Sequence, residues 1–308
     1  MEKTFNYRLI HGLWNLVSHI PLSILYIISD ILYYPFYYVV RYRRKLVRKN
    51  LTTSLPEKSL QEIIRIEKRF YGFLVDYIFE TCKFGTISEK EIGKRMKFTN
   101  IDEMNAVLQQ GKSVSLYVGH YCNWEWLSSF PLYMQAEAAP GQVYHKLHSA
   151  LADQLFLNNR RHFGAVNIEM RETLRWINAH ARNNQTTLVG YIADQAPKGN
   201  AEMPHYTNFL NHKTSALIGA EKITKKYGFE AYYWDMRCVK RGYYEATFVK
   251  MHDNPQSLPD YELTDIYFQH LEKTIRQRPE FYLWSHNRFK KDNRLQTSST
   301  VIKSNFSA

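Results

Sequence analysis

The sequence predicts an α/β fold, with a central mixed sheet flanked by helices and an apolar membrane-anchoring helix near the N-terminus. One observation predicts the sheet. After residue 95, short apolar runs typical of buried strands alternate with longer segments of helical periodicity. A second observation, the apolar run over 22–40, predicts the anchor. With 308 residues, the chain is long enough to bury a sizeable core.

The N-terminal apolar run reads LSILYIISDILYYPFYYVV over 22–40 and carries one formal charge, Asp30. A membrane-spanning helix needs roughly 20 apolar residues, so this run is near the required length. Asp30 and Pro35 leave a kinked or re-entrant interfacial helix open as an alternative to a single span. A buried helix of a soluble protein is the third interpretation.

The anchor is followed at 41–50 by RYRRKLVRKN, which holds six basic residues and no acidic one. Basic flanks stay on the cytoplasmic side and attract anionic lipid headgroups by about 1 kcal/mol per charge. We therefore expect 1–50 to anchor the protein to the cytoplasmic face of the inner membrane. The globular domain then covers 51–293, and 294–308 form a polar tail.

The globular domain begins with a predicted helix over 57–81, which we expect to start at Ser54-Leu55-Pro56-Glu57. The last two predicted strands form an antiparallel hairpin through Lys240-Arg241-Gly242. We expect strands at 113–118, 142–146, 186–192, 230–238 and 243–250, and helices at 123–134, 149–163, 170–182, 213–227 and 261–277.

The charge balance points to an anionic partner, because 41 Lys and Arg face 29 Asp and Glu, a net charge of +12. Nucleic acid, an acidic protein and a phospholipid surface all fit that charge. The chain has no nucleic-acid-binding motif and clusters basic residues directly behind the apolar run. We therefore expect a membrane partner and no nucleic acid.

Three widely spaced cysteines, Cys82, Cys122 and Cys238, argue for a reducing compartment and against a disulfide framework. A nucleophilic role for Cys122 stays open, although a small packing residue is the commoner case. His145 and His148 lack an acidic or histidine partner at ligand spacing, so we expect no metal and no cofactor.

The most informative stretch is GHYCNWE, which follows the predicted strand at 113–118. Gly119 ends the strand and His120 enters the loop, at the sheet edge where α/β enzymes bind ligands. Asn123 is placed to cap a helix that has Glu125 in its first turn. Glu125 can then reach back to one imidazole nitrogen of His120 and leave the other free as a base.

The pair of His120 and Glu125 has no covalent nucleophile at its side, since no serine or lysine stands out. It therefore favours direct transfer, in which the base deprotonates a substrate hydroxyl that attacks an acyl carbonyl. Hydrolysis, with water in place of the hydroxyl, uses the same pair. A noncatalytic membrane scaffold is a further alternative, against which the intact pair argues.

Here the sequence resembles a known family. GHYCNWEW is similar to the GHxxNWE signature of the bacterial lipid A late acyltransferases, and further blocks follow in the family's order over roughly 10–291. These blocks are Arg48-Lys49-Asn50-Leu51 with Leu55-Pro56-Glu57, Arg160-Arg161 before Phe163-Gly164, Ile192-Ala193-Asp194-Gln195, and Pro279 to Lys290, PEFYLWSHNRFK.

The resemblance implies an α/β acyltransferase on the inner leaflet. Its donor would be an acyl thioester, usually acyl-carrier protein, and its acceptor a hydroxyl of a lipid A precursor. It implies His120 as the base and Glu125 as its partner. The residues implied to bind substrate are Asn123, Arg160 in preference to Arg161, Asp194, Gln195 and Arg288.

Two points stay open within the resemblance. Asp194 could shape the site, ligate a cation or form a polar bridge to His120, and we favour the structural role. The segments 196–199, 206–210 and 211–214 depart from the better-known members. An aminolipid or lysophospholipid is therefore the alternative acceptor.

Overall fold

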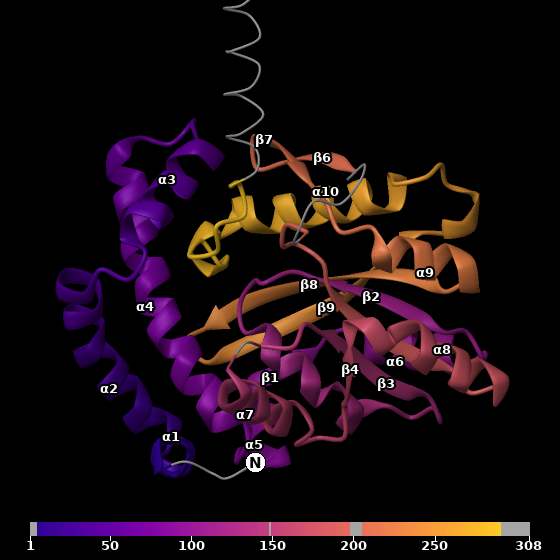
Figure 1. Cartoon of the computed structure of the whole chain (residues 1–308), viewed down its shortest axis with the longest axis horizontal. Coiled ribbons are helices and arrows are strands. Elements are labelled where there is room, and N and C mark those ends of the chain that lie inside the picture. Colours follow the sequence, from indigo (N-terminus) through magenta and orange to yellow (C-terminus); the bar gives the residue numbers. More distant parts are fainter. Residues whose placement is uncertain (1–4, 148, 198–204, 291–308) are drawn as a thin grey trace, which may run out of the picture.

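The computed structural model of the chain describes residues 5–147, 149–197 and 205–290. It confirms the predicted fold class, since a seven-stranded mixed sheet is flanked by helices. A group of N-terminal helices, indigo and violet in Figure 1, packs along one side of the sheet domain. His148, Lys198, Gly199 and the predicted tail at 294–308 lie outside the described residues.

The sheet has the strand order β1-β9-β8-β2-β5-β3-β4. Only the β8–β9 pair is antiparallel, which confirms the predicted hairpin, and the other pairs are parallel. All five residues of β2 are buried, as expected for a parallel strand covered on both faces. The bounds are β1 Met96–Phe98, β2 Val114–Val118, β3 Ala139–Tyr144, β4 Val166–Glu169, β5 Thr187–Ile192, β8 Glu230–Lys240 and β9 Tyr243–His252.

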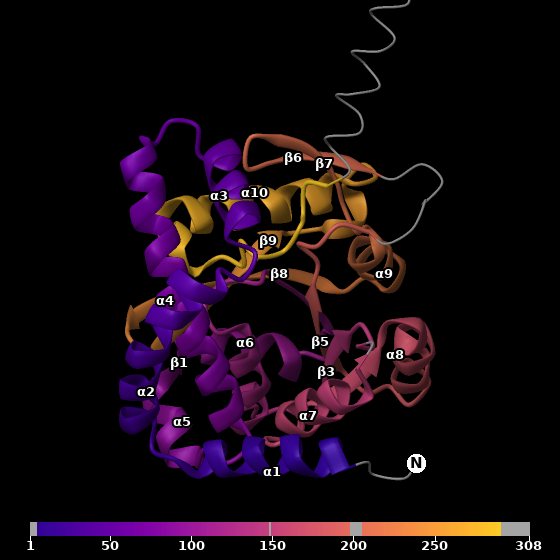
Figure 2. The same cartoon turned by 60° about the vertical axis from the view of Figure 1, so that its left-hand side comes forward.

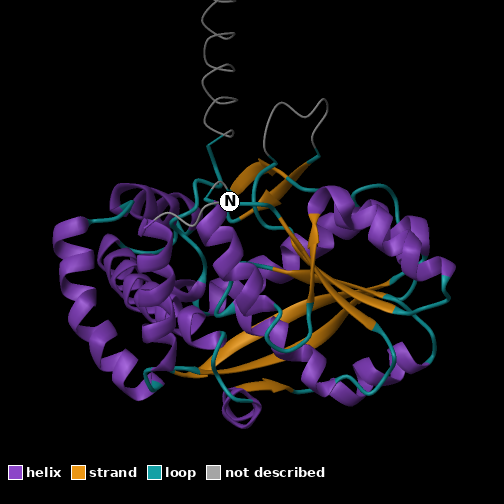
Figure 3. Ribbon diagram, turned by 60° about the horizontal axis from the view of Figure 1, so that its bottom comes forward, coloured by secondary structure: helices purple, strands orange, loops and turns teal. Residues whose placement is uncertain are grey.

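Helices cover both faces of the sheet, as Figures 2 and 3 show. A separate two-stranded sheet, β6 (Tyr206–Phe209) with β7 (His212–Ser215), lies beside the last long helix, α10 (Glu262–Gln277). The remaining bounds in this part of the chain are α5 Glu89–Arg95, α6 Ile101–Gln109, η2 Trp124–Tyr133, α7 Ala150–Arg160, η3 Met170–Glu172, α8 Thr173–Arg182, α9 Gly219–Tyr227, η4 Pro255–Ser257 and η5 Pro279–Phe281.

Some predicted elements need correction. The helix predicted at 57–81 is α4, Leu60–Phe84, and it starts at a capping box between Ser59 and Glu62 instead of at Ser54. The segment predicted as a helix at 123–134 is the 3-10 helix η2. The helix predicted at 213–227 begins only at Gly219, because 212–215 form strand β7.

The N-terminal apolar run forms helix α2 (Leu22–Tyr34) and a π-helical turn, η1 (Pro35–Val40), where Pro35 interrupts regular α-helical bonding. Helix α1 (Phe5–His19) precedes it, and α3 (Arg44–Ser54) follows it. All three helices pack against α4. By length and apolar character, Leu22–Val40 is the one segment of the described chain able to cross a membrane.

One face of α2 docks on α4 through polar contacts. Tyr26 donates to Glu80 at 2.8 Å, and Ser29 donates to Asp76 at 2.6 Å. The opposite face is apolar and exposed to solvent, with Ile24, Ile27, Ile31 and Tyr34 recurring at helical spacing. A soluble protein rarely leaves such a stripe uncovered, so this face is suited to a lipid environment.

Candidate active site

The site lies where the parallel strands β2 and β5 end side by side, with Val118 in register with Ile192. His120 follows β2 by two residues, and Asp194 and Gln195 follow β5 by two and three. Adjacent parallel strands direct their carboxyl ends to one edge, and α/β folds bind ligands at that edge. The sheet thus brings His120 together with Asp194 and Gln195, which lie more than 70 positions later in the chain.

The imidazole of His120 is held from both sides. Its Nδ1 lies 2.6 Å from Oδ1 of Asp194, and its Nε2 lies 3.2 Å from the amide nitrogen of Gln195. The Asp194 side chain is 2% exposed, whereas that of His120 is 15% exposed. His120 therefore has a buried, anchored side and a side that solvent or a substrate can reach.

The charge of Asp194 fixes the tautomer of His120. Burial by itself raises the pKa of Asp194, but the charge and hydrogen bonds of His120 outweigh burial and lower it below the ordinary value. An ionised carboxylate accepts hydrogen bonds only, so Nδ1 carries the hydrogen that it donates to Asp194. When the imidazole is neutral, Nε2 is then an acceptor, which is the state a general base requires.

The structure corrects the expected contact between Glu125 and His120. Glu125 is buried and accepts two hydrogen bonds from Arg160, from Nε and Nη2, each of 2.7 Å. The indole nitrogen of Trp124 donates a third, of 3.1 Å. Because η2 directs Glu125 toward α7, where Arg160 lies, Asp194 takes the position beside His120 that the sequence assigned to Glu125. The less favoured interpretation of Asp194, a polar bridge to His120, is the one observed.

Glu125 is nevertheless linked to His120 through Trp124. The Trp124 ring packs edge-on against the imidazole with centroids 4.9 Å apart, and Tyr77 stacks on the Trp124 ring at 4.4 Å. The hydrogen bond from Trp124 to Glu125 fixes the orientation of this ring. The ion pair of Glu125 and Arg160 thus supports the surface on which the imidazole rests.

Asn123 stands at the start of η2, but its side chain does not cap the helix as expected. Its amide nitrogen instead donates to Glu80 at 2.7 Å. Glu80 is fully buried and also accepts from Tyr26 and Tyr244, and burial raises its pKa to about 7. Glu80 is not among the site residues predicted from the sequence.

A signal for Glu80 exists in the sequence. It lies on the stripe Phe73, Tyr77, Glu80 and Phe84, whose other members are apolar and at helical spacing. A carboxylate on the buried face of an amphipathic helix must be paired, so such a position indicates a polar network.

Gly119 and Cys122 shape the loop that carries His120. A Cβ atom at Gly119 would lie 2.5 Å from a methyl group of Leu271, so glycine permits α10 to approach the loop. Cys122 has a left-handed backbone with φ of 51° and is fully buried. Burial raises the pKa of its thiol well above the ordinary value, which argues against the nucleophilic role left open above.

The C-terminal motif holds the same loop from the other side. Leu283 donates its backbone N–H to the His120 carbonyl at 3.1 Å, and Cys122 donates to the Phe281 carbonyl at 3.0 Å. The block PEFYLW, which is distant in sequence, therefore braces the histidine loop.

The two remaining predicted arginines lie differently from Arg160. Arg161 is exposed at the end of α7. Arg288 is 2% exposed and donates to Thr214 and to the Ser215 carbonyl, which fastens the strand β7. Substrate binding by either stays a prediction, and the buried position of Arg288 gives it a packing role in this structure. Among the described residues, no group of three or more His, Cys, Asp or Glu could hold a metal ion.

A comparison with protein families matches residues 2–291 to the model of the bacterial lipid A biosynthesis acyltransferases. A search of curated proteins finds no match. The family match spans nearly the whole chain and includes the histidine loop, the strand end with Asp194 and the C-terminal motif. The chain belongs to the bacterial lipid A biosynthesis acyltransferase family.

Proposed function

We propose that the protein transfers a fatty acyl chain from an acyl thioester, carried by acyl-carrier protein, to a hydroxyl of a lipid A precursor. Family membership supports acyl transfer and a lipid acceptor. The single observation that supports the mechanism is the imidazole of His120, which is anchored at Nδ1 by the buried Asp194 on a side chain that remains 15% exposed.

In this proposal, Nε2 of His120 removes the proton from the acceptor hydroxyl, whose oxygen attacks the thioester carbonyl. The hydroxyl takes the position beside Nε2 that the amide of Gln195 occupies in this structure. Asp194 stabilises the imidazolium that forms. The tetrahedral intermediate then expels the thiolate, which takes the proton back from Nε2, so that an ester and a free thiol result and His120 is neutral again.

The Glu125–Arg160 pair has a positioning role in this mechanism. Arg160 directs Nε and Nη2 at Glu125, and we assign its third nitrogen, Nη1, to an anionic group of the donor or the acceptor. The acidic donor protein and the phosphates of a lipid A precursor both suit a chain of net charge +12.

We place the protein at the cytoplasmic face of the inner membrane, with α2 in the interfacial plane. Asp30 supports this over a transverse span, because it pairs with Arg241 of the β8–β9 hairpin. The hydrogen bonds from Tyr26 and Tyr37 to α4 likewise hold both ends of the run against the domain. The exposed apolar stripe of α2 would then enter the lipid.

Lipid mass spectrometry of cells with and without the gene tests the function. We expect lipid A to lose the mass of one acyl chain, and the wild type but not His120→Ala to restore it. If lipid A is unchanged and an aminolipid or a lysophospholipid product loses a chain, the acceptor is wrong although acyl transfer stands. If no lipid changes, the proposed reaction is wrong.

A further inference from the structure

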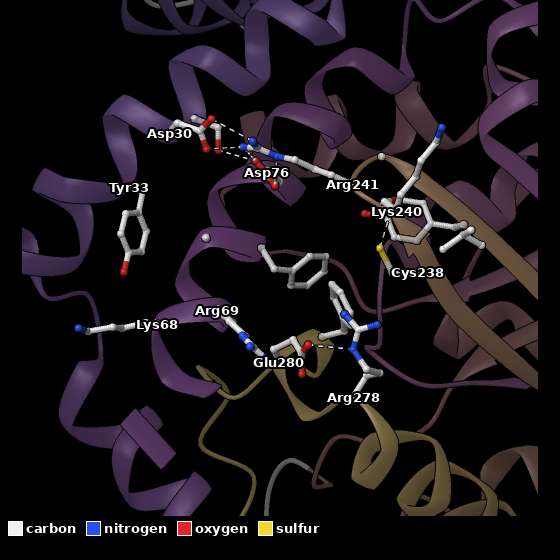
Figure 4. Close-up of a pocket in the computed structure, with 17 residues that line it drawn as sticks. Asp30, Tyr33, Lys68, Arg69, Asp76, Cys238, Lys240, Arg241, Arg278 and Glu280 are labelled. Atoms are coloured by element: carbon white, nitrogen blue, oxygen red, sulfur yellow. Dashed lines mark hydrogen bonds and ion pairs between the residues drawn. The ribbon is translucent and has the colours of Figure 1, made fainter. Parts of the chain in front are cut away.

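A groove of about 700 Å³ opens between α2, α4 and the tip of the β8–β9 hairpin, as Figure 4 shows. Its lining includes neither His120 nor Gln195. Phe73 and Phe281 form part of its wall, with their rings packed edge-on and centroids 5.1 Å apart. The carbonyl of Phe281 accepts the hydrogen bond from Cys122 in the histidine loop. The groove is therefore separate from the proposed acyl-transfer site.

The groove is rich in cationic side chains. Figure 4 shows Arg69, Glu280 and Arg278 toward one end and Asp30, Asp76 and Arg241 at the other. Three carboxylates neutralise two of the cations, since Arg241 pairs with Asp30 and Asp76, and Arg278 pairs with Glu280. The five cations in the lining are Lys68, Arg69, Lys240, Arg241 and Arg278.

Among the ion pairs of the described residues, Lys68 and Arg69 have no carboxylate partner. Both are exposed and follow one another on α4. A guanidinium presents several donors in a planar fork that matches a phosphate group. Arg69 is therefore available to an anionic ligand, with Arg278 across the same end of the groove.

Apolar side chains stand exposed on two sides of this charged groove. Ile31, next to Asp30 on α2, is 64% exposed, and Val239 at the hairpin is 56% exposed. Charged donors within a groove and apolar side chains at its rim match the layers of a membrane surface, where phosphates lie just outside the acyl chains.

We propose that this groove binds the phosphate of a bilayer phospholipid headgroup, with Arg69 as its main ligand. The proposal rests on the membrane placement given above and adds a defined lipid site to it. A phospholipid fits the groove better than an acidic protein does, because the apolar rim would contact acyl chains while the concave lining encloses one headgroup.

The glycine Gly72 permits a test that leaves the charge unchanged. It lines the groove one turn after Arg69, and a Cβ atom there would meet no atom within 4 Å. Gly72→Trp fills the groove. Gly72→Ala is its control, because it also replaces the glycine backbone by that of an ordinary residue but leaves the groove open. Arg69→Gln removes the main ligand, and Arg65→Gln is its matched control on α4, because Arg65 is exposed but does not line the groove.

Binding is measured by co-sedimentation of the full chain with phosphatidylcholine vesicles, with and without phosphatidylglycerol. We expect Arg69→Gln and Gly72→Trp each to lower the partition onto phosphatidylglycerol vesicles about fivefold or more, the effect of one basic contact. Gly72→Ala is expected to bind as the wild type, and Arg65→Gln to lose less than Arg69→Gln. A tryptophan by itself favours membranes, so a loss in Gly72→Trp cannot come from its apolarity.

Unchanged vesicle binding in both groove variants overturns the proposal. If these variants also raise the KM for a detergent-dispersed acceptor, the groove belongs to the acceptor. Competition by inorganic phosphate would show a site for free phosphate and also contradict a lipid headgroup. His120→Ala is expected to bind vesicles normally, so that loss of the proposed reaction and loss of the lipid site are distinguishable.

Discussion

Replacing Asp194 by asparagine tests which carboxylate serves His120. Asparagine has nearly the same shape, but its amide can donate to Nδ1, which moves the imidazole hydrogen to Nε2. The base nitrogen would then carry a hydrogen and could not accept one from the acceptor. The buried charge that stabilises the imidazolium, 2.6 Å from Nδ1, would also be lost.

The expected loss follows from the role of the carboxylate. In a His–Asp pair of this geometry, the amide substitution lowers kcat by roughly 10⁴-fold, or about 5.5 kcal/mol of transition-state stabilisation. The assay is the steady-state rate of transfer from an acyl thioester to a detergent-dispersed acceptor, with circular dichroism to confirm folding.

The chain offers a matched control in a second His–Asp pair. His205 and Asp265 lie 2.7 Å apart at the surface, outside the site, so Asp265→Asn is expected to leave kcat unchanged. Activity of Asp194→Asn within about tenfold of the wild type would contradict this role of Asp194. A far larger loss in Glu125→Gln than in Asp194→Asn, with folding intact, would also contradict it, because Glu125 would then be the true partner of His120.

Three further predictions concern the surroundings of His120. Glu125→Ala leaves Arg160 as a mostly buried, unpaired charge, so it is expected to lower the free energy of unfolding by about 3–5 kcal/mol. Urea titration measures this change. An unchanged urea midpoint would show that the ion pair does not hold the loop. Cys122→Ala is expected to keep its transfer activity. In the folded wild type, Cys122 is expected to resist iodoacetamide, because its thiol is buried and has a raised pKa. Inactivation of the wild type by alkylation of Cys122 would contradict this prediction. Because the pKa of Glu80 is raised to about 7, the folded state keeps a proton on Glu80 that the unfolded state releases above pH 4.5, so the contribution of Glu80 to stability falls as the pH rises from 4.5 to about 7. The melting temperature of Glu80→Gln, relative to that of the wild type, should therefore rise over that interval. A constant difference in melting temperature would contradict the raised pKa of Glu80.

The sequence predicted the elements whose periodicity is strong and local. The strands β2 and β5 and the hairpin β8–β9 lie within two residues of their predicted bounds, because their apolar runs match buried strands. Strand β3 begins earlier than predicted, at Ala139. Its Pro140 and Gly141 read as strand breakers, and pairing with both β4 and β5 outweighs that local preference.

Elements that depend on distant partners were missed or misread. The segment at 212–215 was assigned to a helix, but it pairs with β6 in a small sheet and is held by Arg288, more than 70 positions away. The N-terminal helices α1 and α3 also escaped prediction. Their stable positions come from packing on α4, which no local pattern reports.

The structure brings together three of the predicted site residues, but it does not form the predicted contact between His120 and Glu125. His120, Asp194 and Gln195 were all named, yet the choice between Glu125 and Asp194 depends on strand order. Only the adjacency of β2 and β5 places Asp194 beside the imidazole, and the position of Arg160 on α7 decides where Glu125 points. A motif of short spacing suggests a contact, and tertiary structure determines whether it forms.

The most direct test of His120 as the base is transfer by the purified protein from an acyl-carrier-protein thioester to a lipid A precursor, followed by mass spectrometry of the lipid product. We expect the wild type to add the mass of one acyl chain as an ester, and His120→Ala, folded and bound to vesicles as the wild type is, to add none. Near-normal transfer by His120→Ala, or release of free fatty acid without a lipid ester, would contradict the assignment of His120 as the base for acyl transfer.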